Sequence, residues 1–160
     1  MNETRFVEIR QVELDDAVVA PLLAGLEDEY RRRYGTTAEL AMTASAEFTP
    51  PAGRFLVARD GDLTVAGGGF RRYDAERCEI KRMWVRPSHR RRGLAVRILT
   101  ELESLAVAVG YRRVVLETGP QQPEAQALYA TCGYVRAEAY GPWPNAIAYA
   151  KDLSTGEITP

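Results

Sequence analysis

The segment Glu79–Ala95, with the sequence EIKRMWVRPSHRRRGLA, determines how the rest of the chain is interpreted. It begins with large apolar and aromatic residues that predict a strand, and this strand breaks at Pro87. The basic turn Arg90–Gly93 follows. From Leu94 to about Gly110, apolar residues recur at the spacing of an amphipathic helix. The segment therefore predicts a strand, a basic turn and a helix, in that order.

This order of elements favours an anion site at the start of the predicted helix. The first backbone N–H groups of a helix have no partner within the helix, and the macrodipole adds about half a positive charge there. Gly93 lets a ligand approach the backbone closely because it has no side chain. A phosphate group is the usual ligand of such a site.

Length and composition exclude several classes of protein. A chain of 160 residues is the size of one domain, which we expect over residues 1–153 with a short tail at 154–160. The net charge of −1 and the lack of an extended basic stripe argue against nucleic acid as a partner. No apolar run has the ~18 residues of a membrane span, and no apolar signal segment is present, so we expect a cytoplasmic protein without a membrane partner.

The sequence offers few metal ligands. Cys78 and Cys132 lack the spacing of metal ligands, and with His89 as the single histidine no zinc cluster is expected. We interpret His89 as a solvated loop residue. Glycines 67–69 interrupt a predicted strand, which indicates either a simple bend or space cleared beside a ligand.

The remaining pattern predicts an alternation of strands and helices. The strand–helix–strand unit within residues 78–118 should have parallel strands. The expected elements, in order, are a strand near 6–12, a helix near 22–34 that ends at Gly35, a short helix within 36–48, a hairpin with strands 55–58 and 63–70, a strand at 78–85, a helix at 94–110, a strand at 113–118, a helix at 123–132, and strands that begin near 134 and 146.

Two motifs resemble those of the GNAT superfamily of acyl-CoA N-acyltransferases. Arg90–Ala95 (RRRGLA) is similar to the R/Q-x-x-G-x-G/A signature of that family. The segment Ala125–Tyr134 is similar to its A-x-x-L-Y…G-F/Y segment. Together with the order of elements, the resemblance covers about residues 6–153. It implies an α/β fold of a single GNAT-like domain, with a central mixed, twisted sheet of about seven strands flanked by helices on both faces.

The resemblance also implies acetyl-CoA as co-substrate and assigns the residues that bind it. The turn would hold the pyrophosphate, the Met83 backbone N–H would polarise the acetyl carbonyl, and Val85 would contact the pantetheine arm. Gln122 stands where many members have an asparagine that contacts CoA. The expected cofactor-binding set is Met83, Val85, Arg90, Arg91, Arg92, Gly93, Leu94, Ala95, Val96 and Gln122.

Amide formation from a thioester requires a base for the ammonium group and benefits from an acid for the departing thiolate. Glu79 lies eleven positions before Arg90, as a strand glutamate does in the histone-acetylating branch of the family, and is the expected base. Tyr129 is the expected acid, and its alternative is a buried core tyrosine. The alternative for Glu79 is an ion pair at the strand edge with one of three neighbours, Arg77, Lys81 or Arg82.

Two functions follow from these residues. The first is an N-acetyltransferase that moves the acetyl group of acetyl-CoA to a small-molecule or peptide amine by direct attack in a ternary complex. The resemblance is compatible with a homodimer, since dimers are common in that family. The second is a catalytically silent module that binds acyl-CoA. The charged run around Glu29 is interpreted as solvated surface, with a pocket role for Glu29 or Tyr30 as the alternative. The loop Tyr140–Pro144 is expected beside the acceptor.

Overall fold

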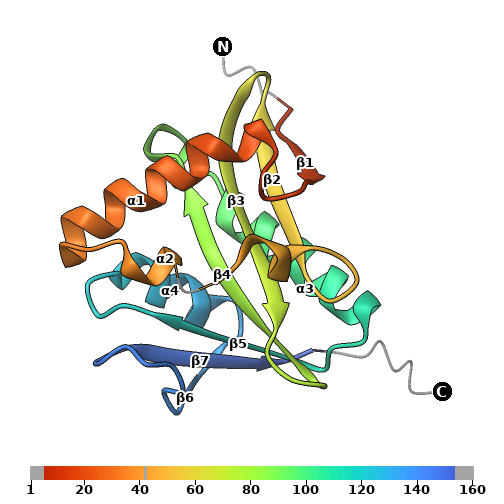
Figure 1. The fold of residues 1–160 in the computed structure, drawn as a ribbon, viewed down its shortest axis with the longest axis vertical. Coiled ribbons are helices and arrows are strands. Elements are labelled where there is room, and N and C mark those ends of the chain that lie inside the picture. Colours follow the sequence, from red (N-terminus) through yellow and green to blue (C-terminus); the bar gives the residue numbers. More distant parts are fainter. Residues whose placement is uncertain (1–5, 42, 154–160) are drawn as a thin grey trace.

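A computed structural model describes residues 6–41 and 43–153 of the chain. These residues form one seven-stranded sheet with the strand order β1-β2-β3-β4-β5-β7-β6, covered by helices (Figure 1). The mixed α/β fold and the predicted order of elements are confirmed. The elements are β1 (Glu8–Gln11), the 3₁₀ turn η1 (Ala17–Val19), α1 (Ala20–Tyr34), α2 (Ala38–Ala41), η2 (Ser45–Phe48), β2 (Arg54–Asp60), β3 (Leu63–Arg72), β4 (Arg77–Val85), η3 (Pro87–His89), α3 (Leu94–Val109), β5 (Arg113–Thr118), α4 (Pro123–Thr131), β6 (Val135–Ala137) and β7 (Ile147–Asp152).

Helices cover both faces of the sheet and divide the core into two layers. On one face α3 packs against β2, β3 and β4, and its buried side chains include Leu94, Ile98 and Leu102. On the other face α1 and η2 bury a second cluster that contains Leu22, Leu26, Phe48, Phe55, Val57 and Trp84. The sheet is therefore enclosed between two apolar layers, as Figure 1 shows for α1 and α3.

The first strand and the second helix are shorter than expected. Phe6, predicted to lie in the first strand, precedes β1 and is 88% exposed. The segment 36–48 forms the single turn α2 and the 3₁₀ turn η2 in place of one longer helix. No helix among the described residues is long and apolar enough to cross a membrane.

The three glycines of β3 allow close packing across the sheet. An added side chain at Gly67 would collide with Leu22 of α1, and one at Gly68 would collide with the Met83 sulfur. The pairing of β3 with β4 shifts here, because Gly67 faces Trp84 whereas Gly69 faces Lys81. This is a β-bulge with one extra residue in β4. The glycines thus permit contact between layers, and they do not border an open space themselves.

The parallel strands β4 and β5 pair only over a short stretch. Their ladder runs from Arg77–Arg113 to Glu79–Val115 and then stops, although β4 continues to Val85. Arg82, in the second half of β4, has a left-handed backbone with φ of 61°, and it lies in the bulge. Beyond Glu79 the two strands therefore separate, and the opening between them is not filled by a neighbouring strand.

Candidate active site

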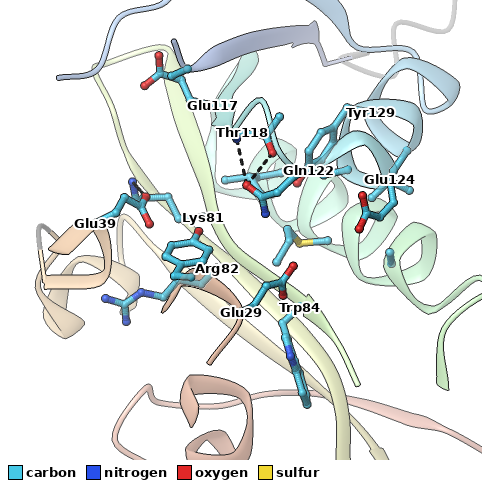
Figure 2. A pocket seen from close by; sticks show the side chains of 18 of the residues that line it. Glu29, Glu39, Lys81, Arg82, Trp84, Glu117, Thr118, Gln122, Glu124 and Tyr129 are labelled. Carbon is cyan, nitrogen blue, oxygen red and sulfur yellow. Dashed lines mark hydrogen bonds and ion pairs between the residues drawn. The ribbon is translucent and has the colours of Figure 1, made fainter. Parts of the chain in front are cut away.

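The opening between β4 and β5 is a cavity of about 1320 Å³. Its walls are β4, the end of β5, one side of α1 and the start of α4 (Figure 2). The turn before α3 and the loop Tyr140–Pro144 line it as well. The cavity is large enough for two ligands, since drug-sized pockets occupy about 300–1,000 Å³.

The predicted anion turn opens into this cavity. Gly93 is the residue before the first turn of α3, with a left-handed φ of 77°, and no side chain caps the helix there. The first turn of α3 carries no acidic residue, and Arg90 and Arg91 lie beside it. An open helix N-terminus next to two guanidinium groups is a favourable place for a phosphate. The expected cofactor-binding residues all line the cavity except Arg92.

His89 is buried, so its interpretation as a solvated loop residue was wrong. Only 8% of the residue is exposed. Its Nε2 lies 3.0 Å from Asp60 Oδ2, and its Nδ1 lies 2.7 Å from Ser88 Oγ. The bond to Asp60 attaches the segment before the basic turn to the end of β2, and it fixes the position of Arg90 relative to the sheet.

Glu79 is buried at the point where β4 and β5 separate, and 4% of it is exposed. Arg71 Nε donates to its Oε1 at 2.8 Å, and the Tyr140 hydroxyl donates to its Oε2 at 2.6 Å. Arg71 is its register partner on β3 and also pairs with Glu47 at 2.8 Å. A buried carboxylate needs such partners, because desolvation of a charge is costly.

The three neighbours expected to pair with Glu79 have other partners, so that alternative was wrong in its residues. Arg77 pairs with Asp74 in the turn before β4. Lys81 pairs with Glu39 of α2 at 3.1 Å. The third, Arg82, donates to the carbonyl of Leu40 in α2 and to that of Thr43 after the helix.

Tyr129 lies on α4 with its side chain directed into the cavity (Figure 2). Its ring packs against Tyr134 and Tyr149, with centroid distances of 5.6 and 6.0 Å. Its hydroxyl makes no hydrogen bond to any described residue. Burial raises the pKa of Tyr129, so the phenol keeps its proton and can act as a donor. The residue is both part of the core and part of the cavity wall.

Gln122 lies just before α4, and its amide oxygen is held by three donors. Gly119 N lies 3.0 Å away, Thr118 Oγ1 3.3 Å and the Tyr34 hydroxyl 3.1 Å (Figure 2 shows the first two). With the oxygen fixed in this way, the amide NH₂ is oriented away from these groups. The sequence predicted a cofactor contact here, and the geometry supplies a positioned donor.

The end of α1 is joined to the loop that carries Gln122. Arg33 donates to the Gln121 carbonyl and to Glu124 Oε1, the latter at 2.6 Å, and it also pairs with Glu29 at 3.2 Å. The bond to Glu124 raises the pKa of Arg33. These contacts span the cavity from one wall to the other.

The charged run of α1 is only partly solvated. Arg32 and Asp28 form an exposed pair, as predicted. The side chain of Glu29 is 13% exposed and lines the cavity, where it lies 3.9 Å from Arg90. Tyr30 lines the cavity as well, and burial, with a smaller effect of Glu39, raises its pKa. The pocket role, which was the alternative, therefore describes Glu29 and Tyr30.

Sequence reasoning missed two charged residues of this site. Arg71 holds Glu79, but it was expected in a polar turn after the strand 63–70, where nothing indicated that contact. The structure extends this strand, β3, to Arg72. Glu117 lines the cavity from the end of β5 and accepts a hydrogen bond from the Tyr140 backbone N–H at 3.1 Å. A carboxylate at the end of a predicted parallel strand is an indication that could have identified Glu117, because ligands bind beyond the carboxyl ends of such strands.

Comparisons with known proteins agree with the resemblance seen in the sequence motifs. Residues 19–134 match the model of the acetyltransferase (GNAT) family. An uncharacterized N-acetyltransferase of Schizosaccharomyces pombe is 32% identical over 117 residues, which cover 68% of this chain and 69% of that protein. A protein of Azospirillum brasilense named IAA acetyltransferase is 39% identical over 56% of this chain and 60% of its own length.

Solved structures share the fold. An acetyltransferase from Streptococcus agalactiae has a TM-score of 0.79 at 18% identity, and it covers 92% of this chain and 98% of its own. A GNAT family acetyltransferase from Elizabethkingia anophelis, solved with acetyl-CoA bound, has a TM-score of 0.68 at 16% identity and covers 92% of this chain and 98% of its own. At such identities the likeness concerns the fold alone.

Proposed function

We propose, from the premise that this chain belongs to the acetyltransferase (GNAT) family, that it transfers the acetyl group of acetyl-CoA to an amine acceptor in a ternary complex. The observation that carries the proposal is the arrangement of one cavity. An open helix N-terminus flanked by arginines lies at one end of the split between β4 and β5, and Glu79 lies where the split begins. A single domain would thus hold both substrates.

The residues present fit acetyl-CoA. The first backbone N–H groups of α3, with Arg90 and Arg91, would hold the pyrophosphate. Val85 and the NH₂ of Gln122 line the path from that turn into the cavity and would contact the pantetheine arm. The bulge in β4 removes part of the strand from the regular ladder, which supports a role for the Met83 N–H toward the thioester oxygen. The bound molecule supplies an activated acyl group, and the chain's residues supply orientation and proton transfer.

Two side chains are proposed to move protons. Glu79 accepts the proton of the acceptor ammonium, directly or through a water molecule, since a thioester is attacked only by the neutral amine. Tyr129 donates its proton to the sulfur as the thiolate departs, and its burial keeps that proton in place until then. No covalent enzyme intermediate is needed.

The alternative is a catalytically silent module that binds acyl-CoA. Both functions require the turn at Arg90, and they differ in whether thiol is released. Acetyl-CoA binding is measured by calorimetry, and free thiol is measured over a broad panel of amines. We expect both binding and amine-dependent thiol release. Binding without thiol release from any amine would favour the silent module.

The variant Glu79→Gln tests whether Glu79 is the base of the transfer reaction. It keeps the size of the side chain and one of its two acceptor oxygens, but it cannot take a proton. We expect acetyl-CoA binding to persist, kcat to fall about 100-fold, and the acid limb of the pH–rate profile to change. An unchanged pH–rate profile would show that another group is the base.

A further inference from the structure

Three cationic side chains line the cavity outside the anion turn, and each already has partners. Arg71 is engaged by the carboxylates of Glu79 and Glu47. Lys81 is paired with Glu39, and its side chain is 15% exposed. The third cation, Arg82, donates to two backbone carbonyls and lies 5.1 Å from the centre of the Phe48 ring. The charges of Arg71 and Lys81 are thus balanced by carboxylates, whereas Arg82 is held by backbone carbonyls and an aromatic ring.

One of the carboxylates that line the cavity has no ion pair. Five line it, and four of them form ion pairs: Glu29 and Glu124 with Arg33, Glu39 with Lys81, and Glu79 with Arg71. Glu117 is the exception, since it has no ion pair among the described residues. Among the described residues, its carboxylate accepts one hydrogen bond, from the Tyr140 backbone N–H to Oε2.

Glu117 and Glu79 are parts of one acceptor-side cluster. Val115 is opposite Glu79 in the parallel ladder, so Glu117, two residues further on, lies on the same face of the sheet. Tyr140 connects the two, because its hydroxyl binds Glu79 and its N–H binds Glu117. Figure 2 shows Glu117 on the side of the cavity opposite Glu124. The unpaired carboxylate is therefore near the proposed base.

Aromatic and apolar side chains complete this part of the cavity. Tyr73 packs against Tyr140 at a centroid distance of 5.1 Å, and both line the cavity. Trp143, Pro142 and Pro144 of the same loop line it too. Ring faces favour a cationic or apolar group and offer nothing to a carboxylate.

We propose that the acceptor is an amine without a carboxylate, carried on an apolar or aromatic body, and that Glu117 binds its ammonium group before proton transfer. This rests on the proposed acetyltransferase function. A free amino acid would place its carboxylate near the unpaired Glu117, while Arg71 and Lys81 are already paired with carboxylates. An arylalkyl or alkyl amine would place its charge at Glu117 and its body against Tyr73, Tyr140 and Trp143.

The test is a panel of matched acceptors that differ in one charge. The sets are phenethylamine, phenylalaninamide and phenylalanine; tryptamine, tryptophanamide and tryptophan; and hexylamine and 6-aminohexanoate. The amides keep the bulk of the amino acid and remove its negative charge. Rates are corrected for the fraction of free amine at the assay pH. We expect kcat/KM for amines and amides to exceed that for the acids by at least about tenfold, because an unpaired like charge is strongly unfavourable in a partly buried site.

Binding is measured in parallel by calorimetry with CoA present, so that the two proposals fail separately. Absence of turnover for the whole panel would refute the transferase function, and the order of affinities would still test the acceptor class. Equal or better use of the acids, in turnover or in binding, would overturn the acceptor class even if the enzyme is active.

Two variants test the charges directly. Glu117→Gln is expected to raise KM for the amines about tenfold with little change in kcat, because the amide oxygen can still accept the Tyr140 N–H. Glu138→Gln, at an exposed position outside the cavity, is the matched control. Glu39→Gln frees Lys81 and should narrow the preference for amines over acids several-fold. Unchanged discrimination in both cavity variants would contradict the proposal.

Discussion

Replacement of Tyr129 by phenylalanine should lower catalysis without weakening the fold. The hydroxyl makes no hydrogen bond to any described residue, and its ring packs against Tyr134 and Tyr149. Tyr129→Phe keeps that packing and removes a single polar atom at the cavity wall. We therefore expect the proposed proton donor to be lost while the core remains intact.

The two effects differ enough in size to be separated. Without a lost hydrogen bond or a cavity, the free energy of unfolding should change by less than about 0.5 kcal/mol. A positioned general acid contributes about 10²–10⁴-fold to rate. The lower value, 100-fold in kcat, corresponds to about 2.7 kcal/mol of transition-state stabilisation. A loss of this size with unchanged stability has no structural explanation other than the missing proton donor.

The assay combines thiol release at saturating acetyl-CoA with thermal unfolding of the same preparations. Tyr149→Phe is the matched control, since Tyr149 belongs to the same aromatic cluster and is 5% exposed but does not line the cavity. We expect kcat of the control to equal that of the wild type. The reasoning would be refuted if Tyr129→Phe kept the wild-type kcat, or if both variants lost activity equally.

Three further changes have defined outcomes. Gly93→Val places a β-branched residue at a φ of 77°, so we expect KM for acetyl-CoA to rise about tenfold and acceptor KM to stay constant in steady-state kinetics. Arg71→Met leaves the buried Glu79 without its cation and should lower the free energy of unfolding in urea by about 2 kcal/mol. A hydrogen bond from Arg77 lowers the pKa of Asp74 from 3.8 to about 2. The resulting stabilisation is present above pH 3.8 and is lost as the pH falls toward 2, so Asp74→Asn should flatten the dependence of Tm on pH in that window.

The features that were predictable depend on contacts that are close in sequence. Apolar periodicity located α3, and Gly93 and Gly110 marked its two ends. The strand–helix–strand unit required parallel strands, and β4 and β5 are parallel. The prediction was less accurate where the sequence has no clear periodicity or capping residue, as in the alanine- and threonine-rich segment 36–48. In this segment Phe48 packs into the core cluster under α1.

The partners of the site residues were not predictable, because they come from distant parts of the chain. Arg71 reaches Glu79 through the register of two antiparallel strands, and Tyr140 reaches it from a loop 61 residues away. Neighbours in sequence were expected instead. Arg77 and Lys81 do share the face of Glu79, two positions away on either side, but they pair with Asp74 and Glu39. His89 was misjudged for the same reason, since its partner Asp60 lies 29 positions away.

The cavity itself has a physical origin that sequence motifs do not express. The parallel ladder ends after Glu79, and the bulge at Arg82 changes the direction of β4 just beyond that point. The pairing of β5 with β7 continues along its whole length, so β5 cannot follow β4. The two strands therefore separate because β5 stays paired with β7 while β4 bends away at its bulge. Residues Glu79 to Val85 of β4 line the cavity in order, from the start of the split toward the anion turn. In the proposed mechanism, this order lets one strand serve both the amine and the thioester.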